Sequence, residues 1–566
     1  MNMKKIFRNS LLMLVAGAFA AACADYNVTD NFKAEPDPAF EVPYADLAPV
    51  KSYLDRSAYP NMSLGAQLSV TEFNKQELAH AAAITNFDNV AFGTTLMAGK
   101  IVNEKGVMNF LDMKDLLDHM EEIGGEVFGS PLFANANQAD SWLKTLTSPI
   151  EIPVDYEGID TVDYNTWPVG NYTGTKDKGN ATIVNYDNQN CLKIATGAWI
   201  RIIEGFELDT LARYTTTFWA KVDKDATFTA TFSGTTVTNK YSSSFGADGK
   251  ITLKAGKWTK VVVEAPCDPH WADSAKVGCF RIENLRNAPI HIQKVMVGFY
   301  PDNHRPQTEQ ELNDTINYAI NAWCDGLMKI NVGRIKSFDL IDEAIDPKVE
   351  LEGEAGVLDL KHSTDANKIF WQDVLGSENY APVTSRVAAA AFAQYEGNPD
   401  ELKFFISEVG LDNQKKFESL KYWIGVWDAR GAKIDGINAK LALTYSEDPT
   451  TQAANEATLN TLLQNLKSTG KLIRLSNFDI KYQDATGASV SASNITPAQR
   501  QQLANYYAYV IKQYMTTIDS DKQAGICKGN MADTADPVGL WSVDSSSKDW
   551  VRTATYEAFC KALTGE

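Results

Sequence analysis

The chain has 566 residues, of which 44% are hydrophobic and 22% charged, and its formal net charge is −19. This length exceeds that of one ordinary domain, so two or three domains are expected. The acidic balance argues against nucleic acid or an anionic membrane surface as a partner, because both require a basic surface.

The first residues are predicted to form a secretory signal. A basic start precedes an apolar run over 11–19, which is far shorter than the roughly 20 residues of a membrane span. Small residues then lead to Cys23. Residues 1–22 are therefore predicted to be a signal peptide, and 23–42 a tether that starts at the cysteine. An ordinary cleavage site beside a chance cysteine is the alternative.

Two periodicities alternate along the rest of the chain. Residues 43–146 show helical periodicity, as in "FLDMKDLLDHMEEIG", where Gly124 is expected to end a helix. The apolar face of that helix is predicted to comprise Phe110, Met113, Leu116, Leu117 and Met120. In residues 147–302, apolar and polar side chains alternate with period two, as in "YTTTFWAKV" and "IHIQKVMVGFY". This alternation predicts an antiparallel sandwich. Residues 303–566 place strand-like pieces between helical stretches, which predicts βα units.

These periodicities predict an α/β fold, a (β/α)8 TIM barrel interrupted by an all-β jelly-roll sandwich. The two helical regions together have about the length of one barrel with insertions. Two unrelated domains are the alternative. Interruption is preferred because the region before the sandwich is too short to close a barrel alone.

"IKSFDLIDEAID" and "LIRLSNFDI" are two strand-like segments of the predicted barrel. They resemble the WDVVNEA segment and the IRITELDI strand of glycoside hydrolase family 10, the xylanase barrels. "ARGAKIDGINAKLALT" and "FDNVAFGTTLMAGK" resemble two further family segments, in the right order. The "AAAC" sequence resembles a bacterial lipobox, which implies lipidation of Cys23. The acidic residues after it resemble the surface-export signal of Bacteroidetes lipoproteins, which implies anchoring in the outer membrane, facing the exterior.

The resemblance implies that most of the catalytic residues are replaced. Glu343 matches the family's general acid/base, but Asn477 stands at the position of its nucleophile. Lys440 stands at a glutamine position, and Lys528 at the position of a sugar-contacting tryptophan. A retaining glycosidase needs two carboxyl groups about 5–5.5 Å apart, and an amide cannot form the covalent glycosyl intermediate in the same way. Asp342 is expected on the opposite face from Glu343, because alternate residues of a strand point to opposite faces.

Another carboxylate could stand in for the missing nucleophile. Asp479, Glu408 and Glu378 are the candidates by position, and Asp479 shares a strand face with Asn477. The competing interpretation of Glu343 is structural: a carboxylate at the end of a strand, bonded to a neighbouring Lys or Arg.

The predicted sandwich resembles a carbohydrate-binding module inserted in the barrel. Sugar rings stack on exposed aromatic faces. The candidate platforms are Trp167, Trp199, Trp219 and Trp271. For any one of them, packing in a core or under a loop is the competing interpretation, and Trp258 is expected to pack.

No metal or cofactor motif is present. The cysteines after Cys23 show no CxxC spacing, and the six histidines form no HxH or HExxH. No cofactor is therefore predicted, although calcium in the sandwich stays open.

Three functions remain. The first is a cell-surface lipoprotein that binds xylan or a related β-glycan with little or no hydrolysis, working beside outer-membrane glycan-import proteins. The alternative is an active endo-1,4-β-xylanase or β-glycanase that uses Glu343 as general acid/base. A purely structural lipoprotein is the third.

Overall fold

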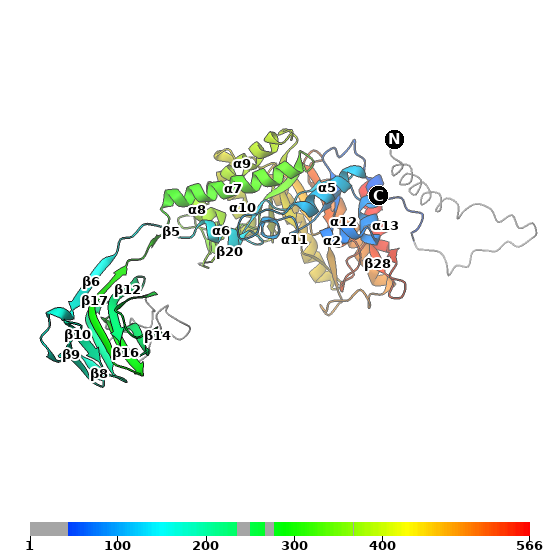
Figure 1. The fold of residues 1–566 in the computed structure, drawn as a ribbon. Coiled ribbons are helices and arrows are strands. Elements are labelled where there is room, and N and C mark those ends of the chain that lie inside the picture. Colours follow the sequence, from blue (N-terminus) through cyan, green and yellow to red (C-terminus); the bar gives the residue numbers. More distant parts are fainter. Residues whose placement is uncertain (1–43, 235–249, 267–276, 366, 566) are drawn as a thin grey trace, which may run out of the picture. The chain divides into compact units, whose positions relative to one another are not determined.

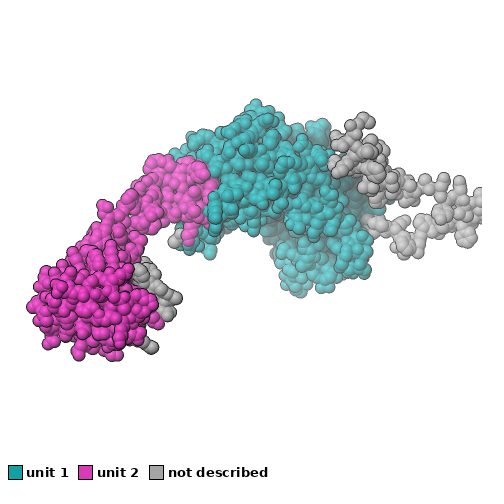
Figure 2. Space-filling model, viewed as in Figure 1, with its two compact units in different colours: residues 1–140, 320–566 teal, residues 141–319 magenta. Residues whose placement is uncertain are grey.

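The computed structural model describes residues 44–234, 250–266, 277–365 and 367–565. The predicted signal peptide, Cys23, the tether and Trp271 lie outside these residues. The chain forms two compact units, Met1–Asp140 with Ile320–Glu566, and Ser141–Ala319 (Figure 2). The second unit is thus inserted within the first, and it also takes in a short helix before the region predicted as a sandwich and part of a long helix after it.

The helices seen in Figure 1 belong largely to the first unit. This unit is built on a parallel sheet with the order β3-β2-β1-β27-β25-β23-β22-β19-β4. Its strands are β1 (Ser63–Gln67), β2 (Asn89–Ala91), β3 (Glu126–Phe128), β4 (Phe133–Ala134), β19 (Ser337–Asp342), β22 (Lys403–Val409), β23 (Gly436–Lys440), β25 (Leu472–Ser476) and β27 (Gln523–Lys528). β3 and β4 belong to one segment, 126–134, and a parallel bridge from Gly129 to Phe338 joins that segment to β19. The last strand in the order, β4, is therefore continuous in sequence with the first strand, β3, so the sheet closes on itself as in a (β/α)8 barrel.

Helices alternate with these strands. They are α2 (Val70–Lys75), α3 (Leu78–Asn86), α4 (Ala98–Ile101), α5 (Leu111–Glu122), α7 (Glu309–Asn331), α8 (Trp371–Leu375), α9 (Tyr380–Gln394), α10 (Gln414–Ala429), α11 (Pro449–Ser468), α12 (Pro497–Thr517) and α13 (Ala554–Thr564). The helix predicted around 110–124 is α5, and four of its five predicted inward residues are buried. The fifth, Phe110, is the N-cap and is half-buried. α12 begins at a capping box between Thr496 and Gln499, with Pro497 in its first turn.

Short elements complete this unit. They are the 3-10 helix η2 (Val50–Tyr53) and the pairs β20 (Ile345–Glu350) with β21 (Leu358–Leu360), β24 (Leu443–Ser446) with β26 (Ile480–Gln483), and β28 (Trp541–Val543) with β29 (Trp550–Arg552). Several of them follow directly on barrel strands. No helix in the described part of the chain is both long and apolar enough to span a membrane.

The second unit consists mainly of two antiparallel sheets around one hydrophobic core. One sheet contains β6 (Glu157–Asp163), β7 (Gly170–Asn171), β9 (Ala181–Tyr186), β10 (Gln189–Ile194), β12 (Arg213–Val222), β15 (Thr259–Pro266) and β17 (Ile290–Tyr300). The other contains β8 (Lys176–Lys178), β11 (Trp199–Glu207), β13 (Ala226–Gly234), β14 (Lys250–Leu253) and β16 (Val277–Arg286). Phe218 of the first sheet contacts Phe228 and Phe280 of the second, so inward side chains of both sheets form the core. The unit also holds α6 (Asp140–Leu146), η3 (Tyr164–Thr166) and the pair β5 (Ile150–Glu151) with β18 (His304–Arg305).

Candidate active site

The candidate residues gather at the carboxyl ends of the barrel strands. Glu343 follows β19, Asn477 follows β25, and Lys440 and Lys528 end β23 and β27. Glu343 and Asn477 have φ angles of 49° and 50°, in the left-handed region, which costs a residue such as Glu about 1–2 kcal/mol but which asparagine adopts more readily. Such strain concentrates at functional sites. The two positions that the resemblance pairs in catalysis thus share an unusual backbone conformation.

Glu343 is held by a lysine. The Nζ of Lys440 lies 2.8 Å from its Oε1. Burial acts to raise the pKa of Glu343, but the hydrogen bond and charge of Lys440, together with the charges of Lys361 and Lys416, hold that pKa below its usual value. The carboxyl group is therefore ionised at neutral pH. A general acid must carry a proton at the pH at which it works.

Lys440 also binds Asp342, at 2.5 Å from its Oδ1. The expectation that Asp342 and Glu343 point to opposite faces does not describe this arrangement. β19 ends at Asp342, and the left-handed backbone of Glu343 breaks the strand's alternation, so both carboxylates reach one ammonium group. Lys440 thus forms ion pairs with two carboxylates. Its own pKa is raised above the usual value, although burial acts in the opposite direction.

Asn477 opens onto two cavities. One, of about 270 Å³, it shares with Asp342 and Lys440. The other, of about 860 Å³, it shares with Thr94, Asp479 and Trp550. The amide side chain is exposed, so it lies where a ligand can reach it.

Asp479 faces the same cavity as Asn477 but is bound by its neighbours. The fully buried ammonium group of Lys528 forms an ion pair with it. The backbone N–H and side-chain amide of Asn530 donate to it at 3.1 and 2.5 Å. Burial lowers the pKa of Lys528, while the charge of Asp479 counteracts that effect. Lys528 thus occupies the carboxylate that is nearest in sequence to Asn477.

The other two candidate carboxylates are also paired. Glu408 is buried and lies 2.7 Å from the Nζ of Lys416. Glu378 is exposed and forms an ion pair with Arg430, beyond the end of α10. Neither lines the cavities that contain Asn477.

The structure describes three of the four predicted sugar platforms, and these three lie in different surroundings. Trp167 packs against the hydrophobic core, with its ring stacked on Tyr172. Trp199 and Trp219 are half-buried on β11 and β12, which belong to different sheets. Their role in sugar binding stays a prediction.

An aromatic cluster that sequence reasoning missed lies on the sheet containing β12. The ring of Tyr186 stacks on His291 with centroids 4.0 Å apart, and Trp258 meets Tyr186 edge-on. The indole N–H of Trp258 donates to Asp187 at 3.2 Å, and Lys221 binds the same carboxylate at 2.5 Å. In the sequence, the only signal for this cluster was a turn motif at Asp187. Asp187 and the next residue form the turn of a hairpin, where Asp and Asn are typical.

Among the described residues, no group of three or more His, Cys, Asp or Glu side chains is arranged to hold a metal ion. Calcium in the second unit stays a possibility raised by the sequence alone.

Residues 302–536 match the model of the family described as glycosyl hydrolase family 10. A comparison with curated proteins finds no match. Among solved structures, the chain is similar to an endo-1,4-beta-xylanase, XylE, of Penicillium canescens, with 12% identity, 92% of this chain and 98% of that chain covered, and a TM-score of 0.49. Xylanase B of Clostridium stercorarium F9 is similar at 9% identity, with 91% and 99% covered and a TM-score of 0.49. A family 10 structure from Paenibacillus barcinonensis is similar at 11% identity, with 89% and 95% covered and a TM-score of 0.48.

Proposed function

From the premise that this chain contains a glycosyl hydrolase family 10 domain, we propose that the protein binds xylan or a related β-glycan at the cell surface and hydrolyses it little or not at all. The substrate class comes from the family resemblance. The absence of efficient cleavage comes from the residues at the barrel mouth.

One observation carries the proposal: the ion pair between Lys440 and Glu343. A glycosidase acid must deliver a proton to the leaving oxygen, so its pKa is normally raised. Here a lysine lowers that pKa, and the facing position holds the neutral Asn477. The two-carboxylate mechanism requires a protonated acid and an anionic nucleophile, and the barrel mouth therefore supplies neither.

Features suited to binding remain at the barrel mouth. The cavity of about 860 Å³ is within the size range of ligand sites and presents amide, hydroxyl and aromatic groups, from Asn477, Asn530, Thr94 and Trp550. Such groups match the hydroxyls and the C–H face of a sugar.

The aromatic cluster of the second unit supports a second contact with glycan. Tyr186 and Trp258 are half-buried, so part of each ring remains accessible. Asp187 and Lys221 lie against these rings and could bond to sugar hydroxyls. We assign this cluster as a further glycan contact of the second unit, beside the tryptophans expected from sequence.

Anchoring rests on the amino-terminal sequence alone. The basic and apolar residues before Cys23 support export and lipidation, which would place the protein on the outer membrane beside glycan-import proteins.

Affinity electrophoresis in gels containing xylan, mixed-linkage glucan or mannan tests binding. We expect retardation in at least the xylan gel, and no retardation in any gel would refute the proposal. Release of reducing sugar from xylan, compared with a Glu343→Gln variant, tests hydrolysis. Equal background release by both proteins supports the proposal, whereas release by the natural protein alone would establish the alternative, an active β-glycanase that uses Glu343.

A further inference from the structure

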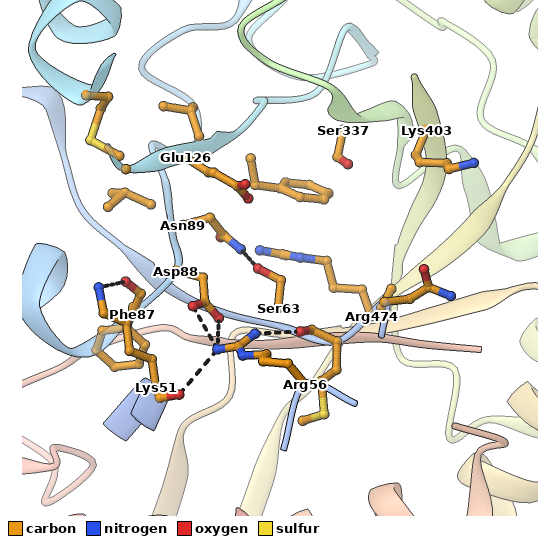
Figure 3. A pocket seen from close by; sticks show the side chains of 18 of the residues that line it. Lys51, Arg56, Ser63, Phe87, Asp88, Asn89, Glu126, Ser337, Lys403 and Arg474 are labelled. Carbon is orange, nitrogen blue, oxygen red and sulfur yellow. Dashed lines mark hydrogen bonds and ion pairs between the residues drawn. The ribbon is translucent and has the colours of Figure 1, made fainter. Parts of the chain in front are cut away.

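A second large cavity opens at the opposite end of the barrel. Its volume is about 560 Å³, and it lies among the first residues of the strands, including Ser63 of β1, Asn89 of β2 and Glu126 of β3 (Figure 3). The candidate active site lies at the carboxyl ends of these strands, and Arg474 and Phe128 line both this cavity and the one of about 270 Å³ that contains Asn477.

Arg474 of β25 lines this cavity with an unsatisfied donor. The residue is only 4% exposed, and its Nη2 has no hydrogen-bond partner among the described residues. The guanidinium carbon lies 3.7 Å from the centre of the Phe128 ring. Figure 3 shows the side chain reaching toward Asn89 and Ser63. A buried cationic donor without an acceptor is costly, so such a group calls for a partner from outside the chain.

The nearby acids do not supply that partner. Asp339, whose pKa is influenced by the charge of Arg474, accepts both of its hydrogen bonds from Asn438. Burial, together with the charge of Asp342, raises the pKa of Asp339 to about 7. At neutral pH it is thus an incomplete counter-charge for Arg474.

The other arginine of the cavity is already paired, and so is one lysine. Both oxygens of Asp88 accept from Arg56, at 2.8 and 2.9 Å. Lys51 donates to two backbone carbonyls, at 2.9 and 3.2 Å. Among the described residues, the ammonium group of Lys403 at the rim forms an ion pair with Asp435 alone, at 3.9 Å. Arg474 and Lys403 are therefore the cations best able to bind an added anion.

An unsatisfied acceptor lies beside this donor. Asn89 donates to the hydroxyl of Ser63 at 2.6 Å, but its own Oδ1 has no partner among the described residues. A β-carbon on residue 65 would lie 2.5 Å from that Oδ1 and 3.3 Å from Nη2 of Arg474. Because residue 65 is glycine, both atoms can pack this closely against the backbone of β1.

Charge favours a singly charged anion here. Although the chain carries a net charge of −19, the cavity lining includes four basic residues and only two acidic ones, Asp88 and Glu126. The basic residues attract an anion, while the two acids disfavour a doubly charged phosphate and can accept hydrogen bonds from hydroxyl groups.

We propose that this cavity binds a small hydroxylated carboxylate, of the sugar-acid class, with its carboxylate on Arg474 and a hydroxyl group donating to Oδ1 of Asn89. A guanidinium group matches a carboxylate through paired N–H donors, and the hydroxyl satisfies the orphan amide oxygen. Asn89 lines this cavity and neither of the two that contain Asn477, so its substitution distinguishes this site from glycan binding at the barrel mouth.

Isothermal titration calorimetry of the full chain with sodium glucuronate tests the site, with glucose and inorganic phosphate as comparison ligands. We expect saturable binding of glucuronate and no measurable binding of glucose. Absence of glucuronate binding, or tighter binding of phosphate than of glucuronate, would overturn the proposal.

Two variants locate the binding. Asn89→Asp places a negative charge beside the bound carboxylate and is expected to weaken glucuronate binding at least about tenfold, which corresponds to about 1.4 kcal/mol. Arg474→Met removes the guanidinium and should abolish binding. Unfolding temperatures without ligand show whether each variant folds, and Asn89→Asp serves alone if Arg474→Met does not. Glucuronate affinity that is unchanged in a folded variant would contradict the assignment.

Discussion

The ion pair at the barrel mouth should be measurable as stability, through a Lys440→Met variant. Methionine keeps much of the volume of lysine but leaves Asp342 and Glu343 without their shared cation. Removing one partner of a buried ion pair typically costs 3–5 kcal/mol. Because the side chain of Glu343 is 38% exposed and solvent screens part of its charge, we expect a loss of about 2–3 kcal/mol in the free energy of unfolding.

The pH dependence of that loss gives its cause. The pKa of Glu343 is lowered in the folded protein, so its contribution to stability is present above the pKa of the unfolded chain and disappears as the pH falls. The variant should therefore differ most from the natural protein near pH 8 and least near pH 4. Urea unfolding followed by tryptophan fluorescence at several pH values measures the difference.

A Lys440→Arg variant is the matched control, because it keeps the positive charge. It should lose less stability than the methionine variant and keep the natural pH dependence. Equal stability of Lys440→Met and the natural protein at pH 8 would refute the view that Lys440 neutralises the two acids.

Three further predictions concern other side-chain contacts. Asp479→Asn leaves the ammonium group of the fully buried Lys528 without its counter-ion, and chemical unfolding should show a loss of about 3–5 kcal/mol; an unchanged midpoint and slope would contradict the pairing. A hydrogen bond of 3.0 Å joins the Nε2 atoms of His80 and His119. Burial, and to a smaller extent the charge of His119, lowers the pKa of His80. The unfolded chain then binds more protons, so stability should fall as the pH drops below about 6.5, less so in His119→Gln; thermal melts at pH 7 and pH 5 test this. Trp258→Ala should reduce retardation in xylan gels without changing the melting temperature of the barrel, and unchanged retardation would remove the aromatic cluster from the glycan contact.

The parallel order of the barrel and α5 could be predicted because both depend on local patterns. The 3.6-residue period along α5 fixes its buried face, and motif order fixes the succession of strands. The pairing of Lys440 with Glu343 depends on two strands that are separated in the sheet by β22, and on a left-handed backbone at Glu343. Neither is a property of a short sequence window.

The aromatic cluster shows the same limit. Trp258 and Asp187 are 71 residues apart and meet only because β9, β10, β12, β15 and β17 form one sheet. Sequence alternation assigned a face to each strand but could not say which strands adjoin. Candidate platforms were therefore chosen by residue type, and Trp167, chosen in that way, packs against the core.

The most direct test of binding without cleavage is prolonged incubation of the purified protein with xylohexaose, followed by mass spectrometry of the sugar. Calorimetry on the same sample establishes that the oligosaccharide binds. We expect binding and recovery of the hexasaccharide intact, in equal yield with the natural protein and with Glu343→Gln. Shorter xylo-oligosaccharides that form with the natural protein, and not with the variant, would show that Glu343 delivers protons despite Lys440 and would contradict the account.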